Sequence, residues 1–164
     1  SKMLFIRREY ESYLLRENIT QEFAKYDIDR QRLFFMNNRK VGRHYLDCYN
    51  EIDMTLDTFP VTGGTTTIDS LWMGVPVITL EGDKVHQRVS STLLKHAKCS
   101  DWVTKDYDGF VKCAANLAAN SEQRQHARRY LREQIKNSTL CDTKRFIKGF
   151  ETAIDKAMNE SINR

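Results

Sequence analysis

Short apolar runs alternate with longer amphipathic segments along the first hundred residues of this 164-residue chain. The runs have the length and composition of buried strands, at residues 3–6, 33–36, 54–56, 75–80 and 101–104. The segments between them have helical periodicity, at residues 18–26, 43–49, 67–73 and 85–96. Because strands that alternate with helices are typical of βαβ units, the pattern predicts an α/β fold with a Rossmann-like parallel sheet flanked by helices.

The last third of the chain carries helical periodicity and no further strand-like run. Asp106 or Asp108 is a suitable N-cap for the first of its helices, and Asp142 for the last, which follows a candidate turn in "NSTLCDT". We therefore expect a single domain over residues 1–164 that ends in a helical tail over about residues 105–164. A strand within the first few residues is unusual for a natural domain start, so we expect a fragment of a longer chain.

Composition excludes several classes of protein. No run approaches the ~20 apolar residues of a membrane helix, so we expect no membrane partner. The 26 Lys and Arg only slightly outnumber the 22 Asp and Glu, and the basic segment "EQRQHARRYLREQIK" has too few aromatic residues for base stacking, so we expect a solvated helix face and no nucleic-acid partner. The four cysteines stand far apart without a metal-binding or redox motif, which favours reduced thiols in a cytoplasmic protein.

The stretch "DTFPVTGGTTTIDSL" joins a strand-like run to a helical one. In an open parallel sheet, ligands bind beyond the carboxyl ends of strands, where such a loop lies. Glycines let a backbone approach a ligand closely, and threonine hydroxyls and N–H groups at a helix start bind anions, so a phosphate or pyrophosphate is the expected occupant. The alternative is a connection with a threonine N-cap and no ligand, because the stretch matches neither the Walker nor the dinucleotide-binding glycine motif.

A longer segment around this loop, "LDTFPVTGGTTTIDSLWMGVPVITLEGDKVHQRVSSTLL", resembles the nucleotide-sugar half of the O-linked N-acetylglucosamine transferase family. The family includes SPINDLY-like members and bacterial tetratricopeptide-repeat glycosyltransferases. The resemblance implies the GT-B architecture, in which two Rossmann-like domains face each other across a cleft and the C-terminal one holds the UDP-sugar. The chain then corresponds to most of that C-terminal half.

The resemblance also implies roles for individual residues. Thr65 and Thr66 would hold the diphosphate, Asp69 would bind the ribose hydroxyls, and family members often carry a histidine where this chain has Gly64. The complete implied UDP-sugar site comprises Lys40, His44, Gly63, Gly64, Thr65, Thr66, Thr67, Asp69 and Arg88. It includes no metal and no cofactor other than the substrate, and this chain contributes no catalytic residue.

Several of these assignments leave alternatives open. His44 would pack near the uracil, or be a surface residue of a helix, and its match needs a one-residue insertion after it. Lys40, or its neighbour Arg39, would face phosphate or ribose. Arg88 would be a ligand contact or a structural anchor, and the loop at residues 81–84 would line the sugar end.

The resemblance predicts an inverting glycosyltransferase that moves a sugar, expected to be N-acetylglucosamine, from a UDP-sugar to protein Ser/Thr. The family's lysine that neutralises the leaving diphosphate precedes this segment, and the acceptor protein would bind to N-terminal regions outside it. The isolated chain is therefore expected to bind UDP without turnover. Two alternatives remain: a non-catalytic Rossmann-like interaction module, and another GT-B enzyme such as an epimerase or a lipid-directed transferase.

Overall fold

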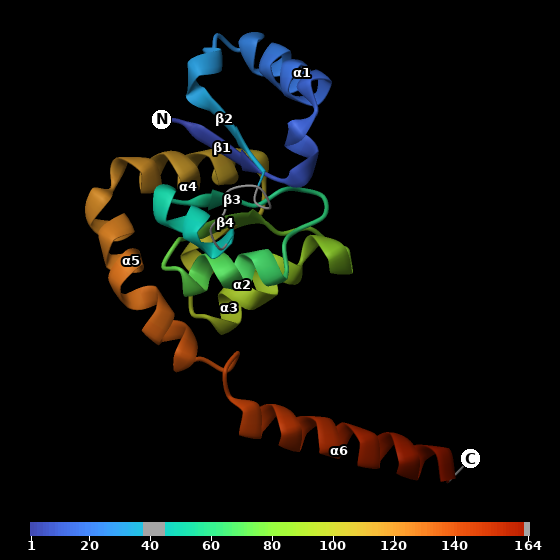
Figure 1. Cartoon of the computed structure of the whole chain (residues 1–164). Helices are drawn as coiled ribbons and strands as arrows, with labels where there is room; N and C mark the ends of the chain where they lie inside the picture. Colours follow the sequence, from blue (N-terminus) through green and yellow to red (C-terminus); the bar gives the residue numbers. More distant parts are fainter. Residues whose placement is uncertain (38–44, 163–164) are drawn as a thin grey trace. The chain divides into compact units, whose positions relative to one another are not determined.

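The computed structural model describes residues 1–37 and 45–162, and they form two compact units, Ser1–Ile52 and Asp53–Arg164 (Figure 1). The first two strands pair with each other, and the last three form a separate sheet. The single domain expected from the sequence stays a prediction. Each unit is described by itself below.

The first unit is built on a parallel pair of strands, β1 (Met3–Ile6) and β2 (Leu33–Met36), in the register Met3 to Leu33. They are connected through η1 (Arg8–Glu11), α1 (Tyr13–Ala24) and η2 (Arg30–Arg32), and η3 (Tyr45–Glu51) follows the undescribed residues. Phe5 stacks on Phe35 across the pair with ring centroids 5.2 Å apart. Helix α1 begins earlier than predicted because the Ser12 side chain accepts a hydrogen bond from the Leu15 N–H.

The second unit contains a parallel sheet of three strands in the order β3 (Thr55–Leu56), β4 (Val77–Leu80) and β5 (Val103–Thr104). All four residues of the central strand β4 are buried, as its mostly apolar run predicts. Each of the five predicted strand regions contains a strand, although the last is shorter than predicted because residues 101 and 102 lie in a 3-10 turn. The described residues contain no strand after residue 104.

Helices pack around this sheet as α2 (Thr65–Trp72), α3 (Val89–His96), α4 (Tyr107–Ala119) and α5 (Ser121–Lys136), with the short turns η4 (Val85–Gln87) and η5 (Ser100–Trp102) between them. The helix predicted over residues 85–96 is thus divided at Arg88, the N-cap of α3. Asp106, rather than Asp108, caps α4, since its carboxylate accepts from the Gly109 N–H. The core contains Leu71, Ile78, Leu94, Leu117 and Ile135.

The basic segment on α5 packs against the end of α2. Arg132 and Arg128 donate hydrogen bonds of 2.8 Å each to the carbonyls of Trp72 and Met73, which satisfies acceptors that a helix end leaves open. Gly74 makes this approach possible: its φ is 75°, and a Cβ there would lie 2.8 Å from the Arg128 carbonyl oxygen. At least part of the segment therefore stabilises the fold.

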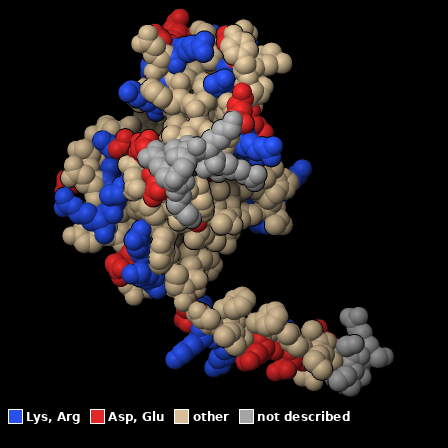
Figure 2. Space-filling model, viewed as in Figure 1, with Lys and Arg blue, Asp and Glu red and all other residues tan. Residues whose placement is uncertain are grey.

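The last helix, α6 (Thr143–Ile162), begins after Asp142, whose carboxylate accepts from the Arg145 N–H as predicted for an N-cap. Its described side chains are exposed, including those of Phe146, Phe150 and Ile154. Figure 2 shows Lys and Arg near its beginning and Asp and Glu farther along. None of the helices in the described ranges is long and apolar enough to cross a membrane.

Candidate functional site

The loop at residues 57–64 leaves the carboxyl end of β3 and leads directly into the N-terminus of α2. It lies at the edge of the parallel sheet where loops of this fold class bind ligands. The loop backbone is fixed to the protein by side chains from its own beginning, from β4 and from α3. Most of these contacts centre on Gly63.

Asp57 connects Gly63 to the central strand of the sheet. One carboxylate oxygen accepts a hydrogen bond of 2.9 Å from the Gly63 N–H, and the other accepts one of 2.7 Å from the hydroxyl of Thr79. Thr79 lies in β4 and is completely buried. The carboxylate therefore ties the loop to the most rigid strand of the unit.

A chain of buried hydroxyls holds the other side of Gly63. Ser90 of α3 donates a 2.9 Å hydrogen bond to the Gly63 carbonyl, so the 2.8 Å contact between Ser90 and Thr67 has the Thr67 hydroxyl as its donor. Thr62 donates to the His86 carbonyl and accepts from the Ser90 N–H. The loop is thus held against α3 and the turn before it.

The two glycines of the loop differ in how much room surrounds them. A Cβ on Gly63 would lie 2.6 Å from the Thr67 hydroxyl oxygen and 2.9 Å from that of Thr66, which is too close for any side chain. A Cβ on Gly64 would meet nothing nearer than a methyl group of Val89 at 3.8 Å. Internal packing therefore requires glycine at position 63, whereas position 64 has space for a side chain.

Two backbone donors at the start of α2 remain available. No residue in the described part of the chain accepts a hydrogen bond from the N–H of Gly64 or of Thr65. The Gly64 carbonyl, in contrast, accepts from the N–H groups of Thr67 and Ile68. Adjacent donors at a helix N-terminus, in the positive end of the helix dipole, suit an anion.

The structure separates the predicted site residues into groups. Thr65 and Thr66 are exposed at the helix start, and Asp69 is half-buried one turn further along α2. Thr67 is only 2% exposed, and its hydroxyl donates a hydrogen bond to that of Ser90. The Thr67 side chain therefore supports the loop from inside. Arg88 is exposed at the N-cap of α3.

Three basic residues considered from the sequence cannot be placed. Lys40 and His44 of the predicted site, and Arg39 beside them, lie outside the described residues. The predicted absence of a metal remains a prediction; within the ranges the structure describes, no group of three or more His, Cys, Asp or Glu side chains is placed to hold a metal ion.

The loop at residues 81–84 begins with an ion cluster at the carboxyl end of β4, in which the side chain of Glu81 is largely covered and its two lysine partners are exposed. The Glu81 carboxylate accepts hydrogen bonds from Lys105, from Lys95 at 2.5 Å and from the Ser91 hydroxyl at 3.0 Å. The two lysines, Lys105 most strongly, hold the pKa of Glu81 down at about 2, against an ordinary value of 4.5. Glu81 therefore stays ionised and joins the ends of β4, β5 and α3.

Sequence reasoning missed the supporting residues Asp57, Thr79 and Ser90. A polar residue inside an apolar strand, as Thr79 is in "VITL", is the kind of signal that indicates a buried hydrogen bond. The partner of such a residue cannot be read from the chain, because Asp57 is 22 residues away from Thr79.

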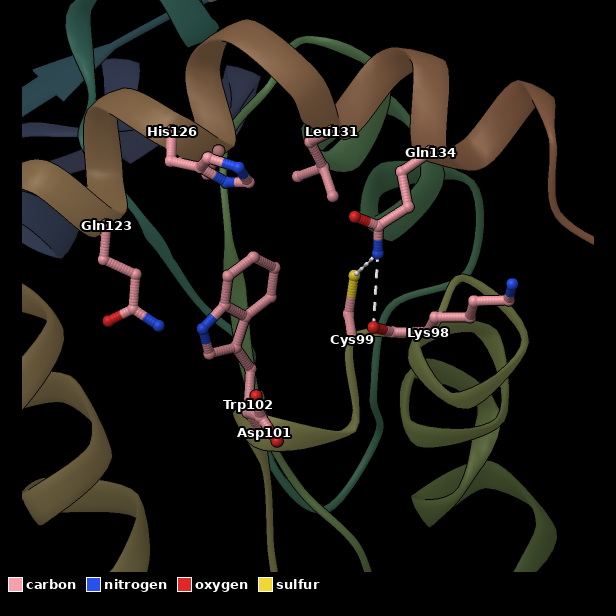
Figure 3. Close-up of a pocket in the computed structure, with 9 residues that line it drawn as sticks. Lys98, Cys99, Asp101, Trp102, Gln123, His126, Leu131 and Gln134 are labelled. Carbon is pink, nitrogen blue, oxygen red and sulfur yellow. Dashed lines mark hydrogen bonds between the residues drawn. The ribbon is translucent and has the colours of Figure 1, made fainter.

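A separate cavity of about 150 Å³ lies between η5 and α5, with none of its lining contributed by the loop at residues 57–64 (Figure 3). Gln134 closes one side by donating hydrogen bonds to the Ala97 and Lys98 carbonyls and to Cys99. Burial raises the pKa of Cys99 to about 11, so its thiol stays protonated and unreactive at neutral pH. The indole N–H of Trp102, buried beside this cavity, has no hydrogen-bond partner among the described residues.

We expect Trp102→Phe to change the free energy of unfolding by less than about 1 kcal/mol. The smaller ring loses contact area, but the substitution also removes a buried donor whose missing partner costs about 1–3 kcal/mol. Urea unfolding of this variant, compared with Trp72→Phe, checks the expectation. Trp72 lies under the cations of Arg132 and Lys136, at 5.5 and 5.9 Å. A loss above about 2 kcal/mol for Trp102→Phe would show that the N–H is satisfied in solution.

Comparisons with known proteins match most of the chain. The family model described as "Glycosyl transferase family 41" matches residues 11–150. Among curated proteins, the probable UDP-N-acetylglucosamine--peptide N-acetylglucosaminyltransferase SPINDLY of Solanum lycopersicum is 30% identical over 138 residues, which are 84% of this chain and 15% of the relative. The SPINDLY protein of Eustoma exaltatum subsp. russellianum is 37% identical over 111 residues, which are 68% of this chain and 12% of the relative. The chain thus spans about 15% or less of these relatives.

Among solved structures, a mutant of the Thermobaculum terrenum O-GlcNAc transferase matches with a TM-score of 0.85 and 27% identity. The match covers 94% of this chain and 30% of that one. Together with the parallel strands flanked by helices, it confirms the predicted fold class, a Rossmann-like sheet of the kind found in the C-terminal half of a GT-B fold.

Proposed function

Because this chain belongs to glycosyl transferase family 41, we propose that its second unit is the donor-binding part of a glycosyltransferase, with a UDP-sugar held at the start of α2. The sugar, expected to be N-acetylglucosamine, is transferred to Ser or Thr hydroxyls of a protein acceptor with inversion. The relatives' names, which specify UDP-N-acetylglucosamine and peptide, support this donor and acceptor. The four dispersed cysteines favour a cytoplasmic protein.

The observation that carries the proposal is the pair of open N–H groups of Gly64 and Thr65 on a loop fixed from inside. When the sugar leaves, negative charge develops on the diphosphate, and preorganised donors aimed at that charge lower the barrier. Thr66 adds an exposed hydroxyl beside them, and Asp69 provides a carboxylate for the ribose hydroxyls.

The remaining proposed contacts are cationic or aromatic. Lys40 and Arg88 would face phosphate or ribose, and His44 would pack near the uracil. The donors at the helix start need no metal to hold a diphosphate, so binding is expected to persist in EDTA. An in-line attack also needs a positioned acceptor hydroxyl, which we assign to regions outside this chain. The isolated chain is therefore expected to bind UDP without turnover.

We expect calorimetric titration with UDP in EDTA to show saturable binding that Asp69→Ala weakens by about tenfold, through loss of a charge-assisted hydrogen bond. Thr66→Val tests the hydroxyl at the same helix start. Asp108→Ala is the matched control, because Asp108 is an exposed carboxylate in the first turn of α4. Absence of UDP binding to the wild type, or equal losses for Asp69→Ala and Asp108→Ala, would contradict the proposal.

A second candidate function, a non-catalytic interaction module, is favoured by the open space at Gly64, where family members often carry a histidine. Packing does not require glycine at position 64. The absence of a histidine there therefore removes a ligand contact without improving the packing of the loop. Transfer activity of the longer parent protein, abolished by Asp69→Ala, would exclude this candidate.

A further inference from the structure

Gly63 is held on both sides by side chains, those of the half-buried Asp57 and the buried Ser90. Its N–H is bound by Asp57 and its carbonyl by Ser90, at 2.9 Å in each case. Asp57 is itself anchored, since its backbone N–H donates to the Ile78 carbonyl at 2.9 Å and its second oxygen accepts from Thr79. Ser90 is completely buried in the first turn of α3.

The carbonyl of Gly63 and the N–H of Gly64 belong to the same peptide unit. In a planar trans peptide these two groups point in opposite directions. Because Ser90 holds the carbonyl toward the interior, the N–H of Gly64 points away from it, toward the open side of the loop. The hydrogen bond from Ser90 to the Gly63 carbonyl therefore also fixes the direction of the Gly64 N–H, because both groups belong to one planar peptide.

We propose that Ser90 and Asp57 are positioning residues of the donor site, which clamp Gly63 so that the Gly64 N–H is aimed at the diphosphate before the ligand arrives. This inference rests on the proposed function. Without the clamp, the loop would have to be ordered at the moment of binding, at a cost in affinity. Neither side chain touches the ligand in this scheme.

The negative charge of Asp57 fits a residue that supports the loop better than one that contacts the diphosphate. A negative charge beside a diphosphate repels it, whereas a carboxylate binds a backbone N–H and a buried hydroxyl through strong, charge-assisted hydrogen bonds. Both of its oxygens already accept a bond from the protein. An asparagine in its place would still offer one oxygen to the Gly63 N–H.

The test compares two neighbouring serines of α3. Ser90 and Ser91 are both completely buried, and each hydroxyl lies within hydrogen-bond distance of two groups. The single proton of Ser91 is shared between Glu81 and the Arg88 carbonyl, and neither belongs to the loop at residues 57–64. We expect Ser90→Ala to weaken UDP binding by about fivefold to tenfold, and Ser91→Ala by less than about twofold, although both lower stability in urea unfolding.

Asp57 provides the second arm of the same experiment. Asp57→Ala is expected to weaken UDP binding by about tenfold and Asp57→Asn by less than about threefold, because the amide oxygen retains the bond to Gly63. In amide hydrogen exchange, the Gly63 N–H should lose protection in Asp57→Ala and keep it in Asp57→Asn.

The outcomes separate this inference from the proposed function. A wild-type chain that binds no UDP overturns the proposed function and, with it, the role of the clamp. Wild-type binding with equal affinities for Ser90→Ala and Ser91→Ala overturns the clamp alone. If Asp57→Asn loses as much affinity as Asp57→Ala while the Gly63 N–H stays protected, the carboxylate itself acts on the ligand, and the positioning role is overturned.

Discussion

Gly63→Ala is expected to weaken UDP binding by about a hundredfold and to lower the free energy of unfolding by about 1–3 kcal/mol. The new methyl group would lie 2.6 Å from the Thr67 hydroxyl oxygen and 2.9 Å from that of Thr66. Thr67 cannot move aside cheaply, because its buried hydroxyl donates to Ser90. The loop must therefore shift, and the open N–H groups shift with it. Calorimetric titration with UDP and urea unfolding measure the two effects.

Gly64→Ala is the matched control. Its methyl group would meet nothing nearer than a methyl group of Val89 at 3.8 Å, which is an ordinary van der Waals contact. We expect affinity within about threefold of the wild type and stability within about 0.5 kcal/mol. If both alanine variants lost affinity equally, close approach of the ligand, and not internal packing, would be the reason for the two glycines.

The strands were predictable from the sequence because parallel strands appear as mostly apolar runs. The run over residues 75–80 corresponds to β4, whose four residues are all buried. Helix boundaries were less accurate, since they depend on single hydrogen bonds. The Ser12 cap starts α1 at Tyr13, five residues before the predicted start. Which strands pair with each other was not predicted, because pairing between distant segments leaves no local signal.

The position of the candidate site could be predicted from glycines and threonines placed after a strand and before a helix. The hydrogen bonds that hold the loop in shape could not be predicted from the sequence. Ser90 acts on Gly63 from 27 residues away, and nothing in "RVSSTLL" tells its role from that of Ser91. Thr67 illustrates the same limit, because three consecutive threonines look alike in the sequence although the third alone points into the protein.

Acidification is expected to remove about 2–3 kcal/mol of stability through Glu81. Lys105 and Lys95 lower its pKa from 4.5 to about 2 in the folded protein, whereas the unfolded chain keeps the ordinary value. Between these values the unfolded state binds the extra proton, so acidification favours unfolding. The contribution is complete above about pH 5, declines as the pH falls, and is lost near pH 2.

Urea unfolding at pH 7 and at pH 3 measures this contribution. The wild type should lose about 2 kcal/mol more on acidification than Glu81→Gln, which has no carboxyl group to protonate at this position. Glu133→Gln is the matched control, because Glu133 pairs with Lys136 on the exposed face of α5. Exposed pairs contribute little, so this variant should follow the wild type within about 0.5 kcal/mol. Equal pH dependence in wild type and Glu81→Gln would mean that the two lysines do not hold the carboxylate in solution, and that the ends of β4 and β5 are joined by the sheet alone.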